Sequence, residues 1–185
     1  MTINPNEVIQ ERLATSMGLR QYSFIMSQVW NVDVSKDEEF QRVFNGYYGV
    51  RRNDGWREKY YEFFEHVKGQ PVSYSDIITW LYQQTGNIEA SFSSKMLATF
   101  NPDCPIWDQY VLKNLNLQLK GYHKPERLSN AIQLYAKIQS WYGEFLETEN
   151  AAACIRAFDQ ALPSYTWISD TKKIDCFLWS MREDI

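Results

Sequence analysis

The sequence predicts an all-α fold, a compact single domain of about nine or ten helices spanning residues 1–185. Three observations support this class. Helix-start signals recur at short intervals along the 185 residues, and apolar residues follow them at the spacing of one helix face. No stretch shows the clean alternation of polar and apolar residues that requires a strand. A chain of this length is most simply one domain.

The first two predicted helices are placed by their caps. Asn4, a first-turn Pro5 and an acidic third position begin one helix, and we expect Gly18 to end it. Ser35 opens a capping box before a second helix that runs to about Tyr47. Seven further helices are predicted from a cap or proline followed by apolar residues at helical spacing: 54–67, 73–86, 91–100, 105–116, 125–146, 150–162 and one beginning at Ser169.

Cysteine and histidine are sparse and isolated along the chain. Cys104, Cys154 and Cys176, with His66 and His123, show no metal-ligand spacing, so the sequence indicates neither a metal site nor a cofactor. The N-terminal stretch carries no basic run followed by an apolar one, and no apolar run approaches the roughly 20 residues that span a bilayer. We therefore expect a cytoplasmic protein without membrane association, and a monomer.

The net charge of −4 on its face counts against nucleic-acid binding, but the local field decides. One stretch, 44–57, contains three glycines and concentrates aromatic and basic side chains, among them Tyr47, Tyr48, Arg51, Arg52 and Arg57. Arginine binds phosphate bidentately and aromatic rings stack on bases, so this stretch indicates nucleic-acid contact. The alternative is a loop whose arginines pair with acidic neighbours and whose rings reach the core.

A second stretch places an aspartate after a helix, a turn and a short helix. The first helix ends in a turn containing Gly86, a proline-bounded loop follows the short helix, and Asp108 stands in the first turn of a third helix. The segment 105–111, Pro-Ile-Trp-Asp-Gln-Tyr-Val, has the order proline, apolar residues, aspartate, polar residue, valine. This layout, over about 75–118, resembles the helix-hairpin-helix DNA glycosylase superfamily, with one residue inserted before the aspartate.

The resemblance implies base excision from DNA, with Asp108 as the catalytic carboxylate. A fixed carboxylate stabilises the oxocarbenium-like centre formed when a glycosidic bond breaks, and the helix N-terminus favours its ionised form. Base flipping would place the target base between aromatic rings. The residues expected to contact DNA comprise pocket walls and phosphate contacts: Tyr47, Tyr48 and Trp107 for the walls, and Arg51, Arg52, Arg57 and Lys95 for the phosphates.

Departures from the family pattern indicate a specialised branch. Only Gly86 matches the usual hairpin glycines, and Lys95 lies thirteen residues before Asp108, closer than the lyase lysine of bifunctional members. We therefore expect a monofunctional enzyme with Lys95 as a phosphate contact or a solvated residue. One such branch comprises small bacterial antiphage glycosylases that attack modified bases, including glycosylated ones, in phage DNA.

The alternative to an enzyme is a non-catalytic helical module that binds nucleic acid or protein. In that case Asp108 only caps a helix, and the basic residues lie on an open face. The C-terminal third indicates scaffold, although the last helix has Lys172 and Lys173 in its first turn, where the helix dipole disfavours cations. A nearby anion, either phosphate or Asp170 and Asp175, would offset that effect.

Overall fold

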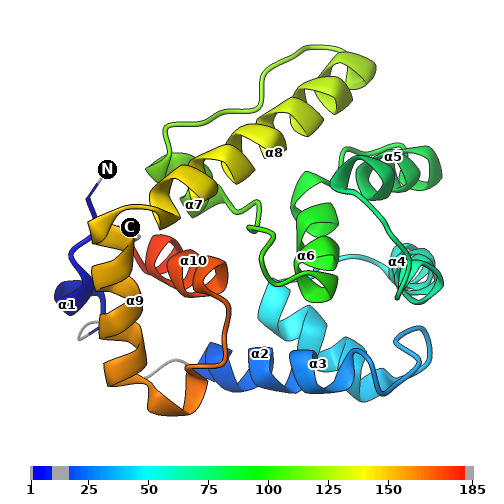
Figure 1. Ribbon diagram of the computed structural model, residues 1–185. Helices are drawn as coiled ribbons and strands as arrows, with labels where there is room; N and C mark the ends of the chain where they lie inside the picture. The colour runs from blue at the N-terminus through cyan, green and yellow to red at the C-terminus, as the bar shows by residue number, and fades with distance from the viewer. Residues whose placement is uncertain (1, 10–16, 182–185) are drawn as a thin grey trace.

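Ten α-helices and one short 3-10 helix form the regular structure of the described residues, 2–9 and 17–181, in this computed structural model (Figure 1). These residues contain no strand, which confirms the predicted all-α class. The helices follow one another along the chain as α1 (Pro5–Val8), α2 (Met17–Gln28), α3 (Glu38–Tyr48), α4 (Asp54–Val67), α5 (Tyr74–Thr85), α6 (Ala90–Phe100), α7 (Gln109–Asn114), α8 (Lys124–Leu146), α9 (Glu149–Ala161), η2 (Pro163–Tyr165) and α10 (Asp170–Ser180).

Local capping chemistry fixes several of these boundaries where the sequence predicts them. Ser73 and Asp76 form a reciprocal capping box at the start of α5. The same helix ends at Gly86, whose φ of 68° lies in the left-handed region that glycine adopts without steric penalty. Ser169 caps α10 by accepting from the backbone N–H of Lys172.

Three predicted boundaries are wrong. Gly18, predicted to end the first helix, lies inside α2, a helix that we did not predict from the sequence. Residues 10–16 of the first predicted helix fall outside the described residues. Asp37, not Ser35, caps α3, because the Ser35 hydroxyl donates to Asp33 and is not available to the helix. The helix predicted from residue 105 begins only at Gln109, since tertiary hydrogen bonds hold the residues before it in a non-helical conformation.

The helices gather into two groups that α8 connects. Figure 1 shows α2 and α3 along the bottom with α4, α5 and α6 to the right, and α1, α9 and α10 to the left. The long α8 packs on α5 in one group and on α9 and α10 in the other. Buried apolar side chains from Ile3 to Leu178 form one hydrophobic core cluster. The loop from α6 to α7, which carries Asp108, runs between the two groups (Figure 1).

The segment 75–118 contains α5, a four-residue turn, α6, the proline-bounded loop and α7. Helices α5 and α6 pack against each other. That this segment is a helix-hairpin-helix element stays a prediction. Within the described part of the chain, no helix is both long enough and apolar enough to span a membrane.

Candidate active site

The loop before α7 is fixed by side chains from two other helices. The Tyr135 hydroxyl of α8 donates to the Pro105 carbonyl at 2.8 Å, in a buried hydrogen bond. The backbone N–H of Trp107 donates to Ser94 Oγ of α6, also at 2.8 Å and buried. Buried backbone groups need such partners. Here the partners also fix the course of the chain immediately before Asp108.

Asp108 itself is half-buried and caps α7. Its Oδ1 accepts from the backbone N–H of Tyr110 at 2.8 Å. Two residues earlier, the backbone N–H of Ile106 acts to lower the pKa of the Asp175 carboxyl on α10. Residues 105–108, here called the clamped loop, are thus held by α6, α7 and α8. The sequence predicts Asp108 in the first turn of a helix that begins near residue 105, and the structure places it at the N-cap of a helix that begins at Gln109.

Lys95 is buried beneath this loop instead of being solvated. Only 8 % of the residue is exposed, and its Nζ donates to the Tyr48 carbonyl at 3.0 Å. The ammonium lies 5.2 Å from the ring centre of Phe92 and 5.8 Å from that of Tyr48, within cation–π range. Burial lowers the pKa of Lys95 to about 8, while the charge of Asp108 acts to raise it. The structure therefore brings Lys95 and Asp108 within electrostatic reach.

A second buried pair lies on α10. Lys172 Nζ is 3.8 Å from Asp175 Oδ2, and both side chains are nearly inaccessible to solvent. The Lys172 ammonium also faces the rings of Tyr22, at 5.2 Å, and Tyr47, at 5.6 Å. Asp175 Oδ1 accepts a short hydrogen bond from the Tyr142 hydroxyl. Burial raises the pKa of the Asp175 carboxyl to about 6, against the opposing effect of Lys172.

These two pairs interact and form one charge cluster: Lys95, Asp108, Lys172 and Asp175. The charge of Asp108 raises the pKa of Asp175, and the charge of Lys172 lowers that of Lys95. Sequence reasoning assigned the two α10 members to scaffold. The available signal was the pair of lysines in the first turn of α10. Both have acidic partners in the structure, since Lys173 pairs with two aspartates.

The predicted pocket walls lie in different surroundings. Tyr47 is half-buried and Tyr48 is buried, and their rings meet edge-on with centres 4.6 Å apart. Tyr22 extends this aromatic group, and the half-exposed Trp167 stacks on Tyr22 with its ring plane within 6° of parallel. Trp107 is buried in the core. Of this aromatic group, Tyr22 and Tyr48 are buried, Tyr47 is half-buried, and Trp167 is the ring that reaches solvent. The sequence did not single out Tyr22 or Trp167.

Two of the three predicted arginine contacts have acidic partners. Arg52 pairs with the buried Glu89 at 2.7 Å, and Arg57 pairs with the exposed Asp54 one turn earlier. Arg51 is exposed to solvent. The alternative interpretation of this stretch, in which its arginines pair with acidic residues of the same chain, therefore describes part of the structure. The partner of Arg52 is buried, and the partner of Arg57 is exposed.

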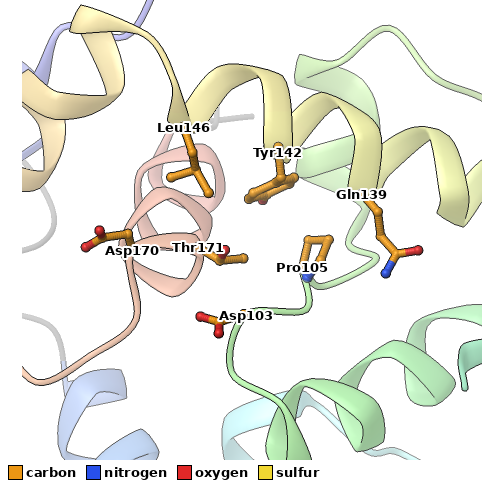
Figure 2. Close-up of a pocket in the computed structure, with 8 residues that line it drawn as sticks. Asp103, Pro105, Gln139, Tyr142, Leu146, Asp170 and Thr171 are labelled. Atoms are coloured by element: carbon orange, nitrogen blue, oxygen red, sulfur yellow. The ribbon is translucent and has the colours of Figure 1, made fainter. Parts of the chain in front are cut away.

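A pocket of about 410 Å³ lies behind the clamped loop, between α8 and the start of α10 (Figure 2). The Tyr142 ring and Leu146 face it from α8, with Asp170 and Thr171 on the opposite side and Asp103 and Pro105 below, as Figure 2 shows. Tyr142 thus contributes its ring to this pocket and its hydroxyl to Asp175. Asp108 does not line the pocket.

Within the described ranges, no three histidine, cysteine or acidic side chains are arranged to hold a metal ion. Comparison of the chain with protein-family profiles, curated proteins and solved structures finds no match. The assignment of function therefore depends on the charge cluster and the clamped loop.

Proposed function

We propose that the protein is a monofunctional DNA glycosylase that hydrolyses the N-glycosidic bond of a modified base, with Asp108 as its catalytic carboxylate. The clamped loop carries this proposal. Capping the six-residue α7 requires only the hydrogen bond from Tyr110, yet the residues before Asp108 are also tied to α6 and α8. Electrostatic catalysis benefits from charges whose position is fixed before reaction.

The chemistry requires one negative charge beside the sugar. When the bond between C1′ and the base nitrogen breaks, its electron pair leaves with the base and positive charge develops on the sugar. The Asp108 carboxylate stabilises that charge and orients the water that attacks C1′. The attacking water loses one proton and the departing base gains one, so the products are an abasic site and a free base.

Lys95 supports the monofunctional assignment. A lyase lysine attacks C1′ with a free amine, and formation of the Schiff base would require that amine to leave its present partner. Here Nζ donates to the Tyr48 carbonyl, and two aromatic rings face the ammonium. In this proposal Lys95 holds a compensating positive charge near Asp108 and forms no covalent bond to DNA.

The substrate is proposed from the resemblance and from the aromatic group near the charge cluster. The half-exposed Trp167, which stacks on the buried Tyr22, suits a flipped base, including a bulky glycosylated base in phage DNA. The cytoplasm is the compartment in which a bacterial enzyme would meet that DNA. This part of the proposal places the protein in antiphage defence.

A second candidate function is a non-catalytic helical module that binds nucleic acid or protein. One observation favours it: Asp108 caps α7 and does not line the 410 Å³ pocket. In that case the clamped loop serves only to join the two helix groups, and no base is released.

The decisive experiment replaces Asp108 by asparagine. Asparagine caps helices as well as aspartate does, so α7 should persist while the charge is lost. Asp37→Asn provides a matched control, because Asp37 caps α3 by the same kind of hydrogen bond away from the charge cluster. DNA carrying varied modified bases, glycosylated cytosine among them, is incubated with each protein, and strand cleavage is measured after alkali treatment.

We expect Asp108→Asn to reduce base release on the order of a hundredfold or more, and Asp37→Asn to leave it unchanged. DNA binding should persist or tighten in Asp108→Asn, because a negative charge near the phosphates is removed. Full activity in Asp108→Asn would refute the assignment. If wild type releases no base but binds DNA, the module interpretation replaces it. Borohydride trapping of a covalent adduct would show that Lys95 acts as a lyase nucleophile.

A further inference from the structure

The loop between α7 and α8 presents an aromatic ring to solvent. Tyr122 is 89 % exposed, whereas the next most exposed large apolar side chains of the described residues, Trp30 and Trp167, reach 53 %. A tyrosine ring in water gains nothing from the hydrophobic effect, and the Tyr122 ring meets that of His123 only edge-on. Packing therefore does not explain why an aromatic residue occupies this position.

The backbone around Tyr122 is nevertheless tied firmly to α8. The Tyr122 N–H donates to a carboxylate oxygen of Glu126 at 3.1 Å, and the Gly121 carbonyl accepts from Arg127 at 3.3 Å. Gly121 has a φ of 113°, and a Cβ there would lie 3.0 Å from Arg127 Cγ. Only glycine fits this close approach. The loop is thus held in one conformation that directs Tyr122 outward.

Basic residues are concentrated near Tyr122 in the sequence, in a protein whose net charge is negative. Lys120 and Lys124, each two residues from Tyr122, are exposed, and Arg127 is half-buried. Glu126 is the acidic residue among them, and its carboxylate accepts from the loop backbone. Residues 120–124, here called the loop tip, therefore combine a positive local field with a solvent-facing ring. These are the two features that bind single-stranded nucleic acid without reading its sequence.

The loop tip contacts the turn between α5 and α6. Lys124 Nζ donates to the Gly86 carbonyl in that turn at 2.6 Å. From the other side, Arg52 pairs with Glu89 at the end of the same turn, next to the exposed Arg51. Basic residues thus flank the α5–α6 turn on both sides, Arg51 and Arg52 in the loop before α4 and Lys124 at the start of α8.

We propose that residues 120–124 form a nucleic-acid contact in which an unpaired base stacks on Tyr122 while backbone phosphates lie against Lys120 and Lys124. This contact extends the DNA footprint of the proposed glycosylase and rests on that function for its biological setting. Its binding properties can be measured without catalysis. The contact also adds cations to the sequence-predicted set, in which Lys95 is buried, Arg57 is paired and Arg51 is exposed.

The test is binding of a fluorescein-labelled oligothymidine, followed by anisotropy across a range of salt concentrations. Tyr122→Ala should weaken binding by about fivefold or more, the effect of losing one stacked base, whereas Tyr122→Phe keeps the ring and should bind like wild type. Trp30→Ala is the matched control, because it removes another exposed ring, two residues after the end of α2 and outside residues 120–124. Lys120→Gln should reduce the logarithmic salt slope by about 0.7, the value for one phosphate of a single strand.

Equal binding by Tyr122→Ala and wild type would overturn the proposal, as would equal losses in Tyr122→Ala and Trp30→Ala. A wild type that binds anionic phosphatidylserine vesicles through Tyr122 but not the oligonucleotide would also overturn it. Failure of the proposed enzyme is distinguishable. If Asp108→Asn retains full base release while Tyr122→Ala loses DNA binding, the catalytic assignment fails and this contact stands. If Asp108→Asn is inactive while Tyr122→Ala binds normally, the contact fails and the enzyme stands.

Discussion

The ionisation of Asp175 makes the stability of the fold depend on pH in a direction opposite to that of most carboxylates. Burial, together with the charge of Asp108, raises its pKa from the ordinary 3.8 to about 6, although Lys172 and Tyr142 oppose this. Between those two values the folded protein binds more protons at Asp175 than the unfolded chain does. Its contribution to the free energy of unfolding therefore falls as pH rises through this window.

The raised pKa of Asp175 corresponds to a change of about 3 kcal/mol in the free energy of unfolding over the whole window. About 2 kcal/mol of this change falls between about pH 4.5 and 7. Asp175→Asn removes the titration but keeps an oxygen that can accept from Tyr142. We expect the free energy of unfolding of wild type, minus that of Asp175→Asn, to fall by about 2 kcal/mol from pH 4.5 to 7. The absolute value of this free-energy difference also includes the loss of the partner of Lys172. The slope of the difference against pH is therefore the diagnostic quantity.

The assay is urea unfolding followed by circular dichroism at a series of pH values. Asp103→Asn serves as the control, because Asp103 is an exposed carboxylate on the loop that leads to the same site, and its curve should run parallel to that of wild type. A wild-type minus Asp175→Asn difference that is flat, or that rises with pH, would refute the assignment of a raised pKa to this buried carboxyl.

Two further variants test the contacts that hold the site. Tyr135→Phe leaves the buried Pro105 carbonyl without its donor and should lower the free energy of unfolding by about 1–3 kcal/mol in urea titrations. It should also slow base release with little effect on DNA affinity, and unchanged stability and rate would show that the clamp at this residue is unimportant. Arg52→Ala leaves the buried Glu89 carboxylate without its ion-pair partner and should lower the free energy of unfolding by about 1–3 kcal/mol. Arg57→Ala breaks an exposed pair and should lower it by about 0.5 kcal/mol or less. Equal melting temperatures for the two arginine variants would contradict this difference.

The sequence alone determined the helical class and most helix boundaries, because the interactions that set them are local. A serine followed three residues later by a carboxylate specifies the start of α5 at Ser73, and a glycine that tolerates positive φ specifies its end at Gly86. Pro125 marks the first turn of α8 for the same kind of reason. One local rule selected the wrong residue, because Asp37 and not Ser35 caps α3.

The sequence also identified Asp108 as an aspartate at a helix N-terminus, again from local pattern. It did not reveal that Lys95 is buried, or that Lys172, which pairs with Asp175, acts on its pKa. Burial of a charge depends on which distant segments meet, and here α10 lies far along the chain from α6 and the clamped loop. A lysine on a short helix and an Lys-x-x-Asp spacing on another are ordinary surface patterns by themselves. Only the packing of both helices around one loop removes these side chains from water, couples their charges and makes the region a candidate active site.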